Sequence, residues 1–309
     1  MCRAPGVAIP AVDEPFLQQL IANGLLVPTG VAGLFGKRGD FEAIVSGIDR
    51  MVERAGADQR AESYRFPPVI ARTLLERSEY LGAFPNLIGS VHSFSGDDVA
   101  HATLLHAVEQ GSDWTGAFEP TQVVLTPAAC YPVYGMMSGT LPTGGRTVDV
   151  MSFCFRHEPS MDPARMQAFR MHEFVRLGSA DACVAFRDGW LERGTELLTS
   201  IGLTPSVAPA NDPFFGRRGR LLSKTQREQS LKFEILVPIT SNEHPTAVAS
   251  SNWHQDHFGE LFGISQANGT VAHTACVGFG LERVTLALLK THGLTIQAWP
   301  ASVRQALAL

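Results

Sequence analysis

Two residues of opposite charge stand two positions apart in the segment FRHE at 155–158. If this segment is a β-strand, Arg156 and Glu158 share one face, and the phenylalanines lie on the other face, where they can pack on a core. A third charge, Arg283, ends the segment GFGLER at 278–283, whose glycines allow a ligand to approach the backbone closely. The two arginines can hold opposite ends of a triphosphate, while Glu158 accepts a hydrogen bond from a base or an amine.

Each pattern also has a simpler interpretation. Arg156 and Glu158 can form an ion pair on a solvated sheet face, and paired glycines often mark a close-packed junction between a strand and a helix. The surrounding elements must therefore decide whether the charges meet at a ligand.

The composition is that of an ordinary globular protein: 309 residues, 45% hydrophobic and 18% charged. The net charge of -5 argues against a general nucleic-acid binder, which carries a basic excess. No apolar run approaches the roughly 18 residues that span a membrane, and the N-terminus lacks the pattern of a signal peptide. Because the five cysteines are few and scattered, we expect reduced thiols or metal ligands in a cytoplasmic protein.

Hydrophobic periodicity predicts the elements that position these residues. Helices are expected at 13–23, 41–55, 69–80, 101–110, 183–201 and 281–289. Strands are expected at 62–66, 87–94, 122–125, 148–155, 233–237 and 271–277, and an exposed loop or insertion at 203–219. Few helices separate successive strands, which predicts an α+β fold with an antiparallel sheet flanked by helices.

Three segments, taken in order, resemble the signatures of class II aminoacyl-tRNA synthetases. The second signature, an F-R-x-E strand with a returning strand, corresponds to Phe155–Glu158 and Arg170–Phe174. The third, G-x-G-x-x-R, corresponds to Gly278–Arg283, and the helix at 41–55 with its following strand and Pro67 matches the first. The resemblance implies the class II synthetase-like fold.

The same resemblance implies how the chain is divided. We expect an N-terminal helix and loop over 1–40 and one catalytic domain over 41–309. Within the catalytic domain we expect a helical and loop insertion at about 183–230.

The resemblance further implies ATP-dependent activation of an amino acid as its adenylate. Arg156 would hold the α-phosphate and the substrate carboxylate, and Arg283 the γ-phosphate. Glu158 would contact the adenine side, and Phe174 would stack on the adenine ring. Further nucleotide or magnesium candidates are Arg165, Lys232, Glu234, Ala249, Ser250 and Asn252. Thr246 stands near the place of an acidic residue of the family, so the magnesium ligands stay open.

Cys130, Glu173 and Cys276 narrow the family. Glu173 lies inside the second signature, and Cys276 comes two residues before the third. Two thiolates and a carboxylate with one open position suit a catalytic zinc ion, although buried cysteines are often only structural. The set resembles the atypical seryl-tRNA synthetases of methanogenic archaea, in which zinc binds the α-amino group of the substrate. A rival pair, His254 and His257, has no third ligand in register, and we expect both at a pocket edge or on the surface.

Only about 40 residues precede the first signature, whereas a seryl-tRNA synthetase carries a further tRNA-binding domain. The chain is thus similar to the amino acid:[carrier protein] ligases, which transfer the activated amino acid to the phosphopantetheine thiol of a carrier protein. The resemblance implies glycine, with alanine next, as substrate, an acidic carrier protein and no tRNA as partner, and ATP, Zn²⁺ and Mg²⁺ as cofactors. The first signature usually builds a two-fold interface, so we expect a homodimer.

A basic strip fits an acidic partner, because six basic residues lie within 16 positions and only Glu228 opposes them. The docking candidates are Arg217, Arg218, Arg220, Lys224 and Arg227. A solvated helix face is the simpler interpretation of this strip. Two other functions remain open: tRNA charging by a minimal class II synthetase, and amino acid or nucleotide binding by a non-catalytic regulatory paralogue.

Overall fold

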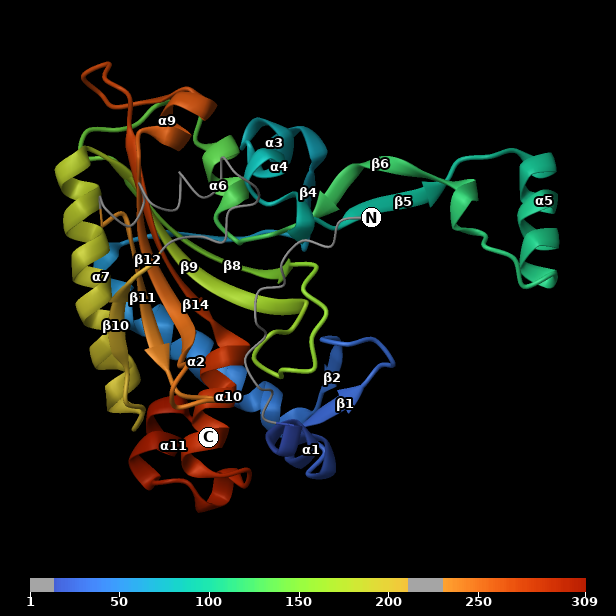
Figure 1. Ribbon diagram of the computed structural model, residues 1–309. Coiled ribbons are helices and arrows are strands. Elements are labelled where there is room, and N and C mark those ends of the chain that lie inside the picture. Colours follow the sequence, from blue (N-terminus) through green and yellow to red (C-terminus); the bar gives the residue numbers. More distant parts are fainter. Residues whose placement is uncertain (1–13, 211–229) are drawn as a thin grey trace.

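A seven-stranded sheet organises the computed structural model, which describes residues 14–210 and 230–309 (Figure 1). The strand order is β10-β11-β12-β14-β9-β8-β3. The bounds are β3 Glu62–Arg65, β8 Arg146–Phe155, β9 Ala168–Gly178, β10 Ser206–Pro209, β11 Lys232–Val237, β12 Thr246–Gln255 and β14 His273–Gly280. All neighbouring pairs are antiparallel except β3 and β8, which run parallel. The predicted α+β class is confirmed.

The helices α2 Gly39–Ala55, α7 Ala180–Ser200 and α10 Leu281–His292 cover one face of this sheet (Figure 1). Below the sheet in this view lie α1 Glu14–Ala22, beside the hairpin near the N-terminus, and α11 Ala301–Leu307, which packs on α2. The apolar stripe of α2 is buried as its 3.6-residue period predicts, and α7 places Cys183, Phe186 and Trp190 in the same core. Thus α7, which falls within the insertion expected at 183–230, packs directly on the sheet.

The opposite face carries a smaller core beneath α6 Tyr131–Met136 and α9 His257–Phe262. Here the expectation that the phenylalanines of β8 face a core is wrong. Cys154 is buried, whereas Phe153 is exposed and lies 5.1 Å from the Arg170 guanidinium. The reason is register: in β8 the residues that share a face with Val148 and Val150 fill this core.

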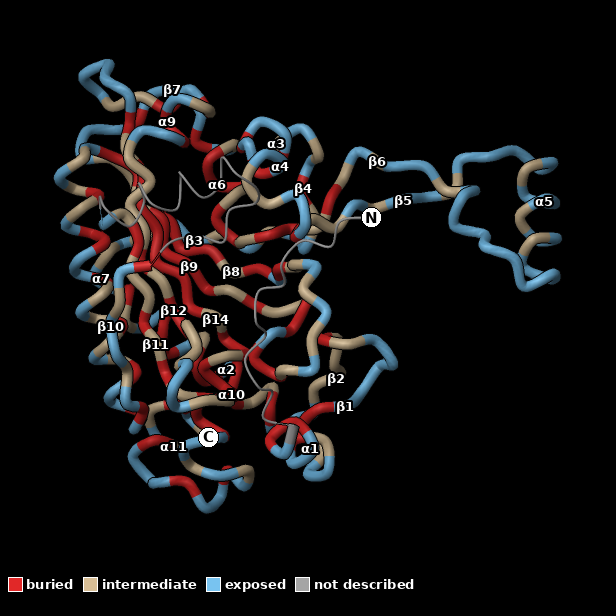
Figure 2. Tube along the Cα trace, viewed as in Figure 1, coloured by how far each residue is buried: buried red, intermediate tan, exposed pale blue. Residues whose placement is uncertain are grey.

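An arm extends from the body of the molecule (Figure 1, right). It is built on a three-stranded sheet in the order β4-β6-β5, with bounds β4 Val69–Ala71, β5 Ser90–Phe94 and β6 Phe118–Leu125. Between β5 and β6 lies the helix α5 Asp98–Glu109, none of whose residues is buried (Figure 2).

Two local expectations are corrected by pairing along the chain. The helix expected at 69–80 is β4 followed by α3 Arg72–Arg77 and α4 Tyr80–Ala83, because the backbone at 69–71 pairs with β6 and Glu79, with φ 58°, interrupts the helix. The loop expected at 203–219 contains β10, whose backbone pairs with β11.

The remaining elements are short. They are the hairpin β1 Leu26–Pro28 and β2 Phe35–Lys37, the parallel pair β7 Gly139–Thr140 and β13 Ile264–Ser265, and 3₁₀ turns at Ala57–Gln59, Pro85–Leu87, Thr115–Ala117 and Ile296–Ala298. None of the described helices combines the length and apolarity needed to cross a bilayer.

Candidate active site

Strand register gathers the candidate residues on the sheet face that the long helices leave free. Directly paired residues of antiparallel strands carry their side chains on the same face. One row across β11, β12, β14 and β9 is Glu234, Ser250, Gly278 and Glu173. The next row begins Lys232, Asn252 and Cys276. Residues far apart in sequence therefore form one continuous surface.

The thiol cluster occupies this face. The ligand atoms of Cys130, Glu173 and Cys276 all lie within 4.8 Å of one another, and the three residues are 6%, 1% and 5% exposed. Cys130 stands directly before α6, while the other two project from neighbouring strands. The backbone N–H of Ala129 donates to Glu173 Oε1 at 2.9 Å and so fixes the carboxylate. The cluster predicted from sequence is thus brought together.

Protonation in the cluster follows from its confined negative charge. The hydrogen bond from the Cys130 thiol holds the pKa of Cys276 well below its usual range, and the same bond raises the pKa of Cys130 well above its own. Burial and the charge of Cys276 raise the pKa of Glu173 to about 7. A cation at the cluster would therefore relieve crowded acidic groups.

These donors fit zinc. Zinc bonds to sulfur and oxygen are about 2.0–2.3 Å long, which places tetrahedral ligand atoms roughly 3.3–3.8 Å apart. A set within 4.8 Å can reach that geometry by small side-chain rotations. Within 14–210 and 230–309, no other group of three His, Cys, Asp or Glu side chains is clustered in this way. Of the rival histidine pair, His254 contacts Cys276, while His257 is exposed at the start of α9.

A group of arginines lies on the same side of the site. Arg156 Nε donates to Pro127 O at 3.1 Å, and Arg283 donates to Ala164 O at 2.8 Å and to Ala247 O at 2.9 Å. Burial and the nearby charge of Arg156 lower the pKa of Arg283. The two arginines thus lie close enough to repel each other, as expected for groups that share an anionic ligand.

Glu158 lies beside this group. Strand β8 ends at Phe155, so Arg156 and Glu158 stand just beyond it. Glu158 Oε1 is 3.9 Å from Arg165 Nη1, and both side chains are partly exposed. The structure therefore brings the charged candidates of the F-R-x-E segment, its loop and α10 into one region.

Phe174 does not belong to the site, contrary to the sequence prediction. Its ring is 2% exposed and packs 4.6 Å from the Trp190 ring, on the face covered by helices. The aromatic residue beside Arg156 is Phe169, whose ring centre lies 5.5 Å from the guanidinium carbon. Phe169 stands four residues before Glu173 and so shares its face of β9, whereas Phe174 has the opposite parity. The position of each phenylalanine relative to Glu173 along the strand could therefore have predicted from sequence which ring faces the site.

Two further candidates differ in their placement. Asn252 Nδ2 lies 3.3 Å from Ser250 Oγ and 3.5 Å from Cys276 Sγ, so it belongs to the surroundings of the thiols. Lys232 Nζ lies 3.3 Å from Glu234 Oε1. The side chain of Ala249 is buried in the core under the helices, so only its backbone could serve a ligand on the free face.

The predicted docking strip cannot be placed. Arg217, Arg218, Arg220, Lys224 and Arg227 lie outside the residues that the structure describes.

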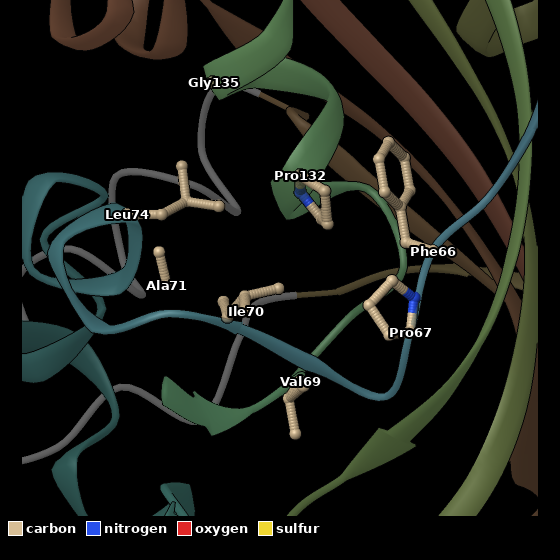
Figure 3. A pocket seen from close by; sticks show the side chains of 8 residues that line it. All are labelled: Phe66, Pro67, Val69, Ile70, Ala71, Leu74, Pro132 and Gly135. Atoms are coloured by element: carbon tan, nitrogen blue, oxygen red, sulfur yellow. The ribbon is translucent and has the colours of Figure 1, made fainter. Parts of the chain in front are cut away.

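An apolar cavity of about 360 Å³ lies beside α6 (Figure 3). Its walls are Phe66, Pro67, Val69, Ile70, Ala71, Leu74, Pro132 and Gly135, and none of the candidate residues lines it. A Cβ at position 135 would lie 2.7 Å from Leu74 Cδ1, so glycine lets α6 lie against α3. With no charged wall, the cavity suits neither phosphates nor a carboxylate.

Comparison with known sequences finds close relatives, although no protein-family model matches the chain. Amino acid–[acyl-carrier-protein] ligase 2 of Bradyrhizobium diazoefficiens is 42% identical over 309 residues, which covers 99% of this chain and 92% of the relative. Ligase 1 of that organism is 42% identical over 302 residues, 97% of this chain and 92% of the relative. The type-2 serine–tRNA ligase of Methanopyrus kandleri is 27% identical over 194 residues, 58% of this chain and 37% of that protein.

Solved structures show the same fold. The M. kandleri seryl-tRNA synthetase in complex with A. aeolicus tRNASec superposes with a TM-score of 0.81 at 21% identity, covering 94% of this chain and 60% of that chain. The Pyrococcus horikoshii seryl-tRNA synthetase complexed with ATP gives 0.69 at 13% identity, covering 95% and 62%. The class II synthetase-like fold predicted from the three signatures is therefore confirmed.

Proposed function

The chain belongs to the amino acid–[acyl-carrier-protein] ligase family, and we propose that it activates a small amino acid and transfers it to the phosphopantetheine thiol of a carrier protein. Glycine is the proposed substrate, with alanine next. The observation that carries the proposal is the cluster of Cys130, Glu173 and Cys276, with Arg156 close enough for its charge to act on both Glu173 and Arg283. The reaction is placed in the cytoplasm, which the four unpaired cysteines of the described chain support.

In the first half-reaction the substrate carboxylate attacks the α-phosphorus of ATP. A new bond joins carboxylate oxygen to phosphorus, the bond to the β-phosphate oxygen breaks, and pyrophosphate leaves. Arg156 stabilises the charge that develops at the α-phosphate, and Arg283 holds the γ-phosphate end. Phe169 takes the place that the sequence prediction gave to Phe174, beneath the adenine. Glu158 contacts the adenine from the loop side.

Metal ions complete the site. Cys130, Glu173 and Cys276 would hold zinc, which as a Lewis acid supplies an anchor for the amino group of the substrate. Lys232, Glu234 and Ser250, on the neighbouring strands β11 and β12, are the proposed residues for binding the phosphates with Mg²⁺.

The space beside the cluster supports a small substrate. A Cβ at position 278 would lie 3.0 Å from Met171 Cε and 3.2 Å from Glu173 Cγ. A larger residue at position 278 would therefore crowd the Glu173 side chain, and glycine keeps that side of the cluster open.

In the second half-reaction the carrier thiol attacks the carbonyl carbon of the adenylate. A thioester forms, the bond to the phosphate oxygen breaks, AMP leaves, and the thiol proton goes to solvent. The basic strip of Arg217, Arg218, Arg220, Lys224 and Arg227 remains the proposed docking surface for the acidic carrier.

The test is transfer to a carrier protein in vitro. With ATP, Mg²⁺, Zn²⁺ and glycine, the holo-carrier should gain the mass of one glycyl group, while the apo-carrier, which lacks the thiol, should gain none. Arg283→Ala should abolish the mass gain. Because a structural neighbour was solved with tRNA, a second reaction contains total tRNA in place of the carrier protein. Formation of acid-stable glycyl-tRNA, with no mass gain on the holo-carrier, would replace this proposal with tRNA charging.

A homodimer is the proposed assembly, and two features support it. Strand β3 ends the sheet with one edge unpaired, which offers a template for association. The arm displays Val99, Leu105 and Val108 on a helix that buries nothing, and an isolated 12-residue helix is marginal in water. The arm also lacks Lys and Arg and carries Asp97, Asp98, Glu109, Asp113 and Glu119, so it suits a second copy better than an acidic carrier.

Shortening the arm tests the homodimer. Phe94 and Phe118 are paired, so an Asn-Gly turn can replace residues 95–117 without changing the strand register. Light scattering should report a dimer for the full chain and a lower dimer fraction for the shortened chain. A monomer in the full chain would contradict the homodimer without touching the ligase reaction.

A further inference from the structure

One histidine faces the thiol cluster without belonging to it. His254 Nε2 lies 3.5 Å from Cys276 Sγ, and its Nδ1 lies 3.1 Å from the hydroxyl of Thr274, which is fully buried. Both contacts join β12 to β14, the strand that carries Cys276. The imidazole therefore links a metal-ligand candidate to a buried hydroxyl group.

His254 lies in a β-bulge of β12. Trp253 pairs with Ala275 and Gln255 pairs with Thr274, so His254 is an extra residue between two pairs. Gln255 adopts a φ of 56°, which marks the distortion. Like Asn252, two residues earlier, His254 lies on the face of β12 that carries the thiol cluster, and there it meets Cys276.

Aromatic rings restrict the imidazole. The ring centre of Tyr134 lies 5.9 Å away at 81°, and that of Phe258 lies 5.0 Å away at 71°, both edge to face. Because Tyr134 and Phe258 are themselves buried, the imidazole has little freedom to swing away from the sulfur. Such fixed orientation is what a group must have to position a metal ligand.

The proton positions follow from the partners. A metal-bound sulfur is a thiolate and only accepts hydrogen bonds. His254 Nε2 must then carry the proton, which leaves Nδ1 to accept from the Thr274 hydroxyl. Asn252 Nδ2, 3.5 Å from the same sulfur, is a second donor. The sulfur thus faces two N–H groups from β12.

We propose that His254 is a positioning residue for the metal centre, which holds Cys276 Sγ in place by an Nε2–H···S hydrogen bond and takes its own orientation from Thr274. This inference rests on the proposed zinc site. Groups that orient metal ligands typically contribute about 10–100-fold to metal affinity. His254 is not itself a ligand in this account.

Side-chain length gives a matched set of variants. In His254→Gln the amide nitrogen takes the position of Nε2, so zinc affinity should stay within a few-fold of the parent. In His254→Asn the amide nitrogen corresponds to Nδ1 and cannot reach the sulfur, so zinc affinity should fall 10–100-fold. His244→Asn, at an exposed position outside the site, is the control and should change nothing.

Zinc dissociation constants are measured by competition with a chromophoric chelator, with the sulfur-to-cobalt charge-transfer band of Co²⁺-loaded protein as a second readout. A band that shifts in His254→Asn but not in His254→Gln supports the hydrogen bond. The inference is overturned if both variants keep the zinc affinity of the parent, and also if both lose it to the same extent. Absence of zinc binding by the parent protein overturns the proposed zinc site instead.

Discussion

The two faces of β9 handle buried charge in opposite ways. On the helix-covered face, Arg170 binds Glu42 through two hydrogen bonds of 2.6 and 2.8 Å and Glu282 through one of 2.9 Å. His172 lies between Asp49 at 2.7 Å and Asp149 at 2.9 Å. On the free face, Glu173 stands beside two cysteines, and the arginines stand beside each other.

The two faces differ in how their buried charges are compensated, and this distinguishes charges that stabilise the fold from charges that could bind a ligand. Charges on the helix-covered face are balanced within the chain, so they hold α2, β9 and α10 together. On the free face three acidic groups gather in the thiol cluster, and burial shifts the pKa of Glu173 to about 7. Groups held in such an environment call for ions of the opposite charge, which is typical of ligand sites. The predictions below change one face while the other serves as its control.

Arg156→Ala tests the free face. The loss of one group that stabilises transition-state charge should slow amino acid-dependent ATP–pyrophosphate exchange by about 10²–10³-fold. Thermal unfolding should change little, because the guanidinium is partly exposed. A large fall in Tm with normal exchange in the folded fraction would assign Arg156 to the structure instead.

Arg170→Met is the counterpart on the helix-covered face. It leaves Glu282, which is 2% exposed, paired with Lys37 and hydrogen-bonded to the backbone N–H of residue 170. Because Glu282 keeps these partners, losing the hydrogen bonds of the guanidinium should lower the free energy of unfolding by about 1.5–3 kcal/mol. Urea unfolding measures this loss, and an unchanged midpoint would show that the network does not stabilise the fold.

The pair Phe169→Ala and Phe174→Ala sharpens the comparison. Removing the Phe169 ring should raise KM for ATP, since stacking of a base on an aromatic ring contributes about 1–3 kcal/mol. Removing the Phe174 ring should instead lower the free energy of unfolding by about 3–5 kcal/mol. Steady-state kinetics and urea unfolding distinguish the two. A raised KM for Phe174→Ala with unchanged stability would restore the original assignment.

The pH dependence of unfolding tests His172. Burial lowers its pKa, but the carboxylates of Asp149 and Asp49 beside the ring outweigh burial and raise it above the ordinary value. A raised pKa in the folded state adds stability that is complete below the unfolded value near 6.5 and is lost as pH rises through the folded value. The free energy of unfolding should therefore fall by up to about 1.4 kcal/mol per pH unit in that window.

The control for this prediction is His172→Gln, which cannot gain that proton. Glu173 also titrates below about pH 7 in metal-free protein, so the difference between the parent and the variant isolates His172. Parallel curves for the two proteins would show that the histidine does not bind an extra proton in the folded state.

Much of the architecture could be predicted because its signals are local. The apolar stripe of α2 follows the 3.6-residue period, and the three signatures identified the fold. The resemblance also predicted that Cys130, Glu173 and Cys276 form one cluster, as the structure has them. What failed depended on distant pairing. Strand β10 exists because β11 pairs with it, and β4 because β6 does. The contact of His254 with Cys276 depends on the pairing of β12 with β14, which no local pattern of the sequence predicts.

Amino acid-dependent ATP–pyrophosphate exchange, measured for all twenty amino acids with zinc-loaded and zinc-stripped protein, tests the central claim most directly. If the free face of the sheet activates a small amino acid, exchange should occur with glycine and more weakly with alanine. Exchange should be lost when zinc is removed and should return when zinc is added again. No exchange with any amino acid in zinc-loaded protein would contradict the account.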